Sequence, residues 1–206
     1  MVAIGPAEAA TMAAIARIQQ IDPPLGSVLA IDPTAIDQAR RIEAQELRGP
    51  LAGIPILLKD NIEAAGPLPT TAGSLALANN VTNRDAPLVA RLRAAGAVIL
   101  GKTNLSEWAN IRSSNSISGW SAVGGQTRNP YALDRDPCGS SSGSGAAVAA
   151  GLVRMAIGTE TDGSVTCPAA LNGIVGPTNA SSWCSLSRRS IPFGPAARKL
   201  VSRAFL

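Results

Sequence analysis

Two serine-rich segments and one lysine supply the residue types from which an enzyme without histidine can build a nucleophilic site. The chain contains no histidine, which excludes Ser-His-Asp and Cys-His catalysis as well as zinc or haem held by histidine. Residues 138–168 combine a Ser/Gly cluster, a helix of small residues and a second Gly-Ser turn. A flexible Gly/Ser linker would not be interrupted by a packed helix and a strand, so we interpret this segment as a site.

A serine nucleophile needs a base, and without histidine the suitable candidate is a lysine that burial makes neutral. The chain has three lysines, Lys59, Lys102 and Lys199. Lys59 directly follows the apolar run 54–58, where desolvation would lower the pKa of its ammonium group as a general base requires. We interpret Lys102, at the end of a second apolar run, as structural, and Lys199 as part of a basic tail.

Two short motifs match functional patterns, but the rest of the sequence lacks what each function requires. Residues 96–103 fit the P-loop expression GxxxxGK[ST], yet a helix is expected before them and their variable positions form an apolar strand. Because a strand cannot surround a phosphate with its amides, we interpret this match as chance. Residues 139–143 fit the nucleophile-elbow pattern GxSxG, whose chemistry requires a histidine that the chain lacks.

Several stretches match one known family: GIPILLKDNI at 53–62, TAGS at 71–74, GKTNLSEW at 101–108, GGQTRNP at 124–130 and the block 139–168. On these stretches the chain resembles the amidase signature enzymes, and within them it is most similar to bacterial peptide amidases. The resemblance covers roughly residues 10–177. It is highly specific, because a lysine after a strand, a serine cluster and a second serine follow in this order.

The resemblance implies amide hydrolysis through a Ser-Ser-Lys triad. Ser164 corresponds to the nucleophile, Lys59 to the base, and Ser140 to a bridging serine that follows a cis peptide bond in the family. Neutral Lys59 would accept a proton from Ser140, which relays one from Ser164 as Ser164 attacks the carbonyl. Water then cleaves the acyl-enzyme to release an acid and ammonia or an amine. The oxyanion hole is expected at the backbone amides of Thr161, Asp162, Gly163 and Ser164.

Other residues near these motifs have two interpretations each. We favour capping or packing over catalysis for three neighbouring hydroxyl groups, those of Ser141, Ser142 and Ser144. Asp162 either contacts the substrate or bonds to nearby backbone amides. Trp108 and Asn110 either line a pocket or fill the core, and we favour the core.

Charge is distributed unevenly along the 206 residues, whose net charge is +4. Residues 1–177 carry 13 bases and 14 acids, whereas residues 178–206 carry five bases and no acid. Because the body lacks a basic face, we expect a small-molecule or peptide amide as the partner rather than nucleic acid. No apolar run has the length of a membrane span, and no basic residue precedes Arg17. We therefore expect a soluble, cytoplasmic protein without a signal peptide.

The three cysteines, Cys138, Cys167 and Cys184, are widely spaced, odd in number and without a CxxC pair. This pattern argues against a disulfide framework and a metal site, so we expect reduced thiols. The chain also offers no residues that call for a cofactor. We expect neither a metal nor a cofactor in the site.

Helices alternate with strands along the chain. Helices are expected over 8–19, 34–47, 85–95, 104–109 and 143–154, and strands over 54–58, 97–100 and 155–157. Thr34 and Asp85 are candidate caps, and residues 104–107 resemble a capping box. The alternation predicts an α/β fold with much of the sheet parallel. The resemblance implies the amidase signature fold, a mixed central sheet flanked by helices, incomplete in this chain.

Family members are generally much longer than this chain, and the sequence changes character near residue 176. We expect residues 1–177 to be the N-terminal part of an amidase signature domain, and residues 178–206 to be a divergent basic tail produced by a frameshift or truncation. An amidase is the first functional hypothesis. The alternatives are an inactive truncated family member and a nucleotide-binding module that uses residues 96–103.

Overall fold

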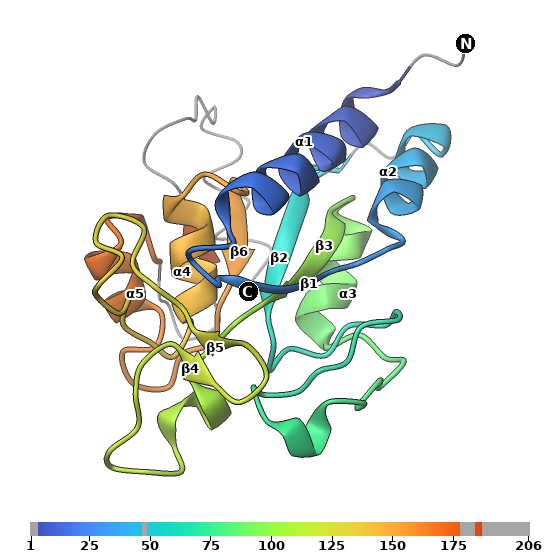
Figure 1. The fold of residues 1–206 in the computed structure, drawn as a ribbon. Helices are drawn as coiled ribbons and strands as arrows, with labels where there is room; N and C mark the ends of the chain where they lie inside the picture. Colours follow the sequence, from blue (N-terminus) through green and yellow to red (C-terminus); the bar gives the residue numbers. More distant parts are fainter. Residues whose placement is uncertain (1–3, 47–48, 178–183, 187–206) are drawn as a thin grey trace.

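The chain folds around a mixed five-stranded sheet with helices on both faces (Figure 1). The computed structural model describes residues 4–46, 49–177 and 184–186. The elements in chain order are α1 (Pro6–Ile21), β1 (Val28–Ile31), α2 (Ala35–Ala44), β2 (Pro55–Lys59), the 3-10 helix η1 (Leu75–Leu77), α3 (Pro87–Ala94), β3 (Val98–Thr103), the 3-10 helix η2 (Glu107–Asn110), β4 (Trp120–Ser121), β5 (Gly125–Gln126), α4 (Ser142–Ala149), β6 (Met155–Ile157), α5 (Thr166–Leu171) and β7 (Cys184–Leu186).

The sheet has the order β1-β3-β2-β6-β7. Its three central strands, β3, β2 and β6, run parallel, and the two outer strands are antiparallel to their neighbours. The predicted α/β fold, a mixed sheet flanked by helices with much of it parallel, is therefore confirmed. Because the central strands are parallel, their C-terminal ends lie at one edge of the sheet, where Lys59 ends β2 and Thr103 ends β3.

Each face of the sheet buries its own apolar cluster. Leu57 of β2 faces the cluster beneath α1, α2 and α4, whereas Ile56 and Leu58 face the cluster that contains residues of α3. This alternation follows from the opposite directions of successive side chains in a strand. Strands buried on both faces read as continuous apolar runs, which is why the sequence predicts β2, β3 and β6 well.

Helix α4 lies so close to the neighbouring backbone that residue 143 must be glycine. A Cβ at Gly143 would collide with the carbonyl oxygens of Ser27 and Asn104. The Gly143 N–H donates a hydrogen bond of 3.0 Å to the Asn104 carbonyl, which fixes the first turn of α4. The small residues of this predicted helix thus serve close packing, and they hold the serine cluster at the edge where Lys59 lies.

The predicted helix caps have different outcomes. Thr34 occupies the N-cap position of α2 as predicted, but its hydroxyl donates to Asp32 at 2.7 Å and makes no hydrogen bond to the helix backbone. The Asp85 carboxylate accepts from the Ala65 N–H at 2.7 Å, and α3 has no side-chain cap. Glu107 accepts from a distant backbone amide at 2.9 Å, so no capping box forms.

The remaining elements are short, and they were not predicted. Strand β1, helix α5 and the β4–β5 hairpin inside the expected loop 110–138 have between two and six residues each. Residues 98–103 of the P-loop match form strand β3. Of the expected basic tail, residues 184–186 form β7, and the rest lies outside the described residues. In the described part of the chain, no helix has the length and apolar character needed to cross a membrane.

Candidate active site

Lys59, Ser140 and Ser164 form one continuous chain of polar contacts at the C-terminal edge of the central strands. Lys59 Nζ lies 2.7 Å from Ser140 Oγ, and Ser140 Oγ lies 3.0 Å from Ser164 Oγ. These residues are 81 and 24 positions apart in the sequence, and three separate segments bring them together. The structure therefore places all three predicted triad residues side by side.

Lys59 is fully buried, with 0% of its surface exposed. Burial lowers the pKa of its ammonium group from 10.5 to about 7, and the charge of Glu160 opposes this shift. An amine of this pKa is neutral in a large fraction of molecules near neutral pH, which is the state a general base needs. Nζ also lies 2.8 Å from Thr159 Oγ1 and 3.1 Å from the Thr159 carbonyl oxygen.

Ser140 is fully buried just before helix α4, and the peptide bond between Gly139 and Ser140 is cis. The next hydroxyls bond to backbone, as the packing interpretation expects. Ser141 Oγ donates to the Thr159 carbonyl at 3.2 Å, and Ser142 Oγ donates to the Cys138 carbonyl at 2.6 Å. Ser144 Oγ donates to the carbonyl oxygen at the end of β6 at 3.0 Å.

Ser164 lies half-buried in the turn between β6 and α5. Glu160 shapes this turn, because its carboxylate accepts from the N–H groups of Val165 and Thr166 at 2.8 and 3.0 Å. Burial by itself raises the pKa of Glu160, but the bonds from Thr166 and Val165 outweigh it and hold the pKa below its usual value. Of the four predicted oxyanion residues, Gly163 and Ser164 are half-buried. Thr161 and Asp162 are exposed.

Cys138 and Cys167 form a disulfide with a Cα–Cα distance of 5.9 Å, which contradicts the expectation of reduced thiols. Their spacing of 29 residues gave no hint of a pair. The fold brings them together because one cysteine precedes Ser140 and the other lies in the first turn of α5. Cys184, the third cysteine, lies in β7.

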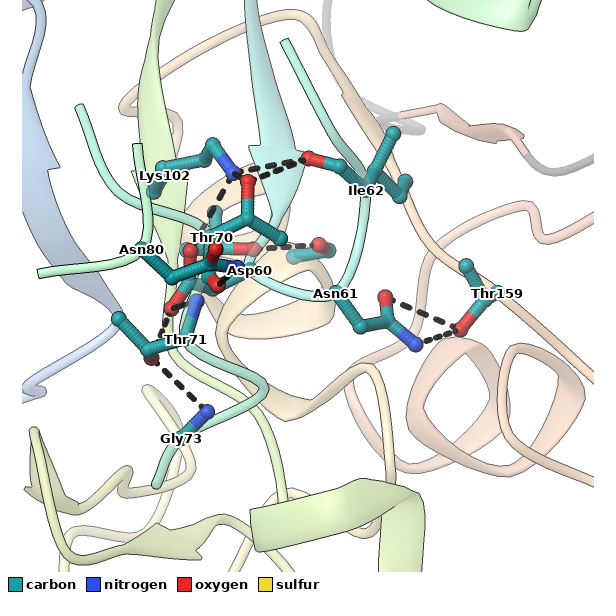
Figure 2. A network of polar contacts seen from close by, with 11 residues as sticks. Asp60, Asn61, Ile62, Thr70, Thr71, Gly73, Asn80, Lys102 and Thr159 are labelled. Atoms are coloured by element: carbon teal, nitrogen blue, oxygen red, sulfur yellow. Dashed lines mark hydrogen bonds and ion pairs between the residues drawn. The ribbon is translucent and has the colours of Figure 1, made fainter. Parts of the chain in front are cut away.

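A buried ion pair fixes the loop that follows Lys59 (Figure 2). Lys102 Nζ lies 3.3 Å from Asp60 Oδ1, and only 3% and 2% of the two side chains are exposed. Lys102 also donates to Thr70 Oγ1 and to the Ile62 carbonyl, both at 2.8 Å. The Thr71 N–H donates to the second Asp60 oxygen at 3.1 Å, and the Thr71 hydroxyl donates to the same atom. Lys102 is thus structural, as its position predicted.

Trp108 and Asn110 do not fill the core, contrary to our expectation. Both are half-buried and line a cavity of about 470 Å³ together with Ile117 and Trp120. The segment before Trp108 is tied to the serine cluster, because the Ser106 N–H donates to the Ser140 carbonyl at 3.0 Å. The backbone is left-handed at Trp108, Ala109 and Asn110, and apolar composition alone did not indicate that.

Two contact residues of the site, Thr159 and Asn61, were missed by the sequence analysis. Thr159 lies two residues after β6, and Asn61 lies two residues after Lys59. Polar residues that follow adjacent parallel strands converge at one edge of the sheet. Because β2 and β6 were both predicted, this rule could have identified Thr159 as a residue of the site.

Comparison with known proteins agrees with this fold. The family model described as Amidase matches residues 9–200. A probable amidase of Arabidopsis thaliana is 45% identical over 201 residues, covering 92% of this chain and 39% of that protein. A glutamyl-tRNA(Gln) amidotransferase chain of Symbiobacterium thermophilum is 46% identical over 169 residues, covering 79% of this chain and 33% of that protein.

The structure of native peptide amidase from Stenotrophomonas maltophilia is similar to this chain with a TM-score of 0.79 and 58% identity. That match covers 82% of this chain and 36% of the peptide amidase chain. The present chain therefore spans between about a third and two-fifths of the length of these relatives. With a family model that matches most of its residues, the chain belongs to the amidase family.

Proposed function

We propose that this chain hydrolyses a carboxylic amide, in particular the C-terminal amide of a peptide, to an acid and ammonia through an acyl-enzyme. Ser164 is the nucleophile, Ser140 the relay and Lys59 the base. The observation that carries the proposal is the unbroken path of 2.7 and 3.0 Å from Lys59 Nζ through Ser140 Oγ to Ser164 Oγ. The substrate class is supported by the 58% identity to a peptide amidase.

The direction of the proton path depends on the charge of Lys59. When Lys59 is an ammonium group, its N–H donates to Ser140 and Ser140 donates to Ser164, and neither serine is activated. When Lys59 is neutral, the same distances let Ser164 donate to Ser140 and Ser140 donate to the Nζ lone pair. Attack of Ser164 on the amide carbonyl then moves one proton along each link. The returning proton leaves with the departing ammonia, and water cleaves the ester that remains.

The developing oxyanion requires donors beside Ser164. The proposal assigns this role to the backbone amides of Thr161, Asp162, Gly163 and Ser164, where one donor typically contributes about 3 kcal/mol to transition-state stabilisation. Glu160 fixes the turn that carries these amides through its bonds to the N–H groups of Val165 and Thr166.

Release of ammonia from a C-terminally amidated dipeptide tests this proposal. We expect turnover by the purified chain and its loss in Ser164→Ala. Ser114→Ala serves as the matched control, since it removes the hydroxyl of an exposed serine. Denaturant unfolding of all three proteins shows whether each is folded. A folded chain without turnover, or turnover that survives in Ser164→Ala, would contradict the proposal.

A further inference from the structure

Thr159 supplies two of the three polar contacts of Lys59 Nζ. Its hydroxyl oxygen lies 2.8 Å from Nζ and its carbonyl oxygen 3.1 Å, while Ser140 Oγ supplies the third contact at 2.7 Å. An ammonium group has three N–H donors, and these three acceptors satisfy all of them. A neutral amine has two N–H donors and one lone pair, so its orientation decides which neighbour faces the lone pair.

We infer that Thr159, whose hydroxyl is held by Asn61, is a positioning residue that turns the lone pair of neutral Lys59 toward Ser140. The inference deepens the proposed amidase function and rests on it for the role of Lys59. A carbonyl oxygen can only accept, so it always takes one N–H of the amine. If the Thr159 hydroxyl oxygen takes the other N–H, the lone pair is left facing Ser140.

Asn61 prevents the Thr159 hydroxyl from reversing this arrangement. The Asn61 amide lies against Thr159 Oγ1 with Nδ2 at 2.9 Å and Oδ1 at 3.3 Å (Figure 2). A hydroxyl has one donor and two acceptor positions. Asn61 Oδ1 takes the hydroxyl proton, while Asn61 Nδ2 and Lys59 Nζ fill the two acceptor positions. The hydroxyl therefore has no proton left to donate to the lone pair of Lys59.

Ser141 fixes the backbone of Thr159 independently of its side chain. The Thr159 N–H donates to Ser141 Oγ at 3.2 Å, and Ser141 Oγ donates to the Thr159 carbonyl at 3.2 Å. Ser141 itself is only 2% exposed. A substitution confined to the Thr159 side chain should leave the carbonyl contact to Lys59 in place. The hydroxyl can thus be tested alone.

A direct test measures the Lys59 ammonium titration in Thr159→Val and Thr159→Ser by NMR. The full chain labelled in its lysines gives few signals, because it has three lysines, and Lys59→Met identifies the one that belongs to Lys59. Thr159→Val deletes an acceptor of the ammonium form, so we expect the pKa of Lys59 to fall below that of the unsubstituted chain by roughly half a unit or more. Thr159→Ser should leave it unchanged.

The direction in which the pKa of Lys59 changes shows whether Thr159 positions Lys59 or only packs against it. Glu160 is the charged group that acts on Lys59, and neither substitution alters it. If Thr159 only filled space, valine, which has nearly the same volume, would leave the pKa of Lys59 unchanged. A rise or an unchanged pKa in Thr159→Val would overturn the inference. This measurement needs no turnover, so it still decides the inference if the chain proves unable to hydrolyse amides.

Steady-state kinetics on the amidated dipeptide provides the second test. We expect Thr159→Val to lower kcat by about 10- to 100-fold with KM within about threefold, because general-base assistance is lost while binding is kept. Asn61→Leu should lower kcat about tenfold, since the freed hydroxyl then competes for the lone pair. Thr159→Ser should stay within about threefold of the unsubstituted chain. Equal kcat values in all four proteins would overturn the inference.

Discussion

The disulfide between Cys138 and Cys167 joins the two segments that carry the serines of the candidate triad. Cys138 lies two residues before Ser140, and Cys167 lies three residues after Ser164. A second link joins the same segments, because the Ser141 N–H donates to the Ser164 carbonyl at 3.0 Å. The distance between the two serine hydroxyls therefore depends on both a covalent and a hydrogen-bonded connection.

Removal of this disulfide should destabilise the chain and lower amide turnover. Closing a loop of 29 residues stabilises a fold by about 3.6 kcal/mol in the chain-entropy description. We expect the double variant Cys138→Ala, Cys167→Ala to lose about this much free energy of unfolding in urea. A reductant should have the same effect on the unsubstituted chain and none on the double variant. Cys184→Ala is the matched control, and a reductant effect that persists in the double variant would contradict the assignment.

Much of the sheet could be predicted because its strands are buried on both faces. Runs such as 54–58 and 97–100 are apolar throughout, and burial on both faces requires that composition. The caps could not be predicted, since Asp85 bonds to Ala65 twenty residues away. A side chain with a tertiary partner no longer follows local preference, and a single sequence does not show which partner it meets.

Residue type alone predicted Lys59, because without histidine a buried lysine is the remaining candidate base, whereas Ser140 and Ser164 were predicted from the family resemblance. In the structure, Ser140 is within hydrogen-bond distance of both Lys59 and Ser164. Thr159 and Asn61 were missed because threonine and asparagine are common and carry no such restriction. Their roles depend on hydrogen-bond geometry around one nitrogen, which only the three-dimensional structure supplies.

The low pKa of Lys59 predicts that amide turnover rises with pH through about 7. Lys59 must be neutral to accept a proton, so kcat/KM should increase about tenfold per pH unit below this value and level off above it. The pH dependence of kcat/KM measured between pH 5 and 9 checks this expectation. A plateau that extends down to pH 5 would show that no group with a pKa near 7 limits the reaction.

The amino group of Lys59 should also make the free energy of unfolding depend on pH. The pKa of Lys59 is lowered from 10.5 to about 7 on folding, so between these values the unfolded chain binds a proton that the folded chain does not. Stability then rises as pH rises through this window and is constant below it. We expect a rise of up to about 5 kcal/mol. In Lys59→Met this contribution should be absent, and the difference between the two unfolding curves isolates it.

The buried pair of Asp60 and Lys102 should be more sensitive to loss of one partner than to loss of both. Burial raises the pKa of Asp60 and lowers that of Lys102, so each charge is costly without the other. We expect Lys102→Met to reduce the free energy of unfolding by about 3–5 kcal/mol, and Asp60→Asn combined with Lys102→Met to restore part of it.

An exposed pair provides the control for this double-mutant cycle. Arg84 contacts Glu63 at 2.6 Å, but 74% of the arginine side chain is exposed. Arg84→Met should therefore lower the free energy of unfolding far less than Lys102→Met does. Equal costs for Lys102→Met and Arg84→Met would refute the argument that burial determines the effect.

We expect substitution by alanine to have different effects at two glycines of helix α4. A methyl group at Gly143 would collide with the backbone oxygens of Ser27 and Asn104, whereas one at Gly145 would meet Pro168 Cβ at 3.1 Å. Backbone atoms held by hydrogen bonds cannot yield cheaply, so Gly143→Ala should destabilise the chain by about 2 kcal/mol or more. Gly145→Ala should be nearly neutral, because the gain of about 1 kcal/mol in helix propensity offsets a mild contact.

The two variants also distinguish an effect on the stability of the fold from an effect on the position of Ser140. To accommodate alanine at 143, the first turn of α4 must move away from Asn104, and Ser140 lies immediately before this turn. We expect the remaining folded fraction of Gly143→Ala to turn over amide at least about tenfold more slowly than Gly145→Ala, because small displacements of a reacting group are costly. Rates are compared per folded molecule, with unfolding curves giving that fraction. Equal rates per folded molecule would mean that α4 contributes to stability but does not set the position of Ser140.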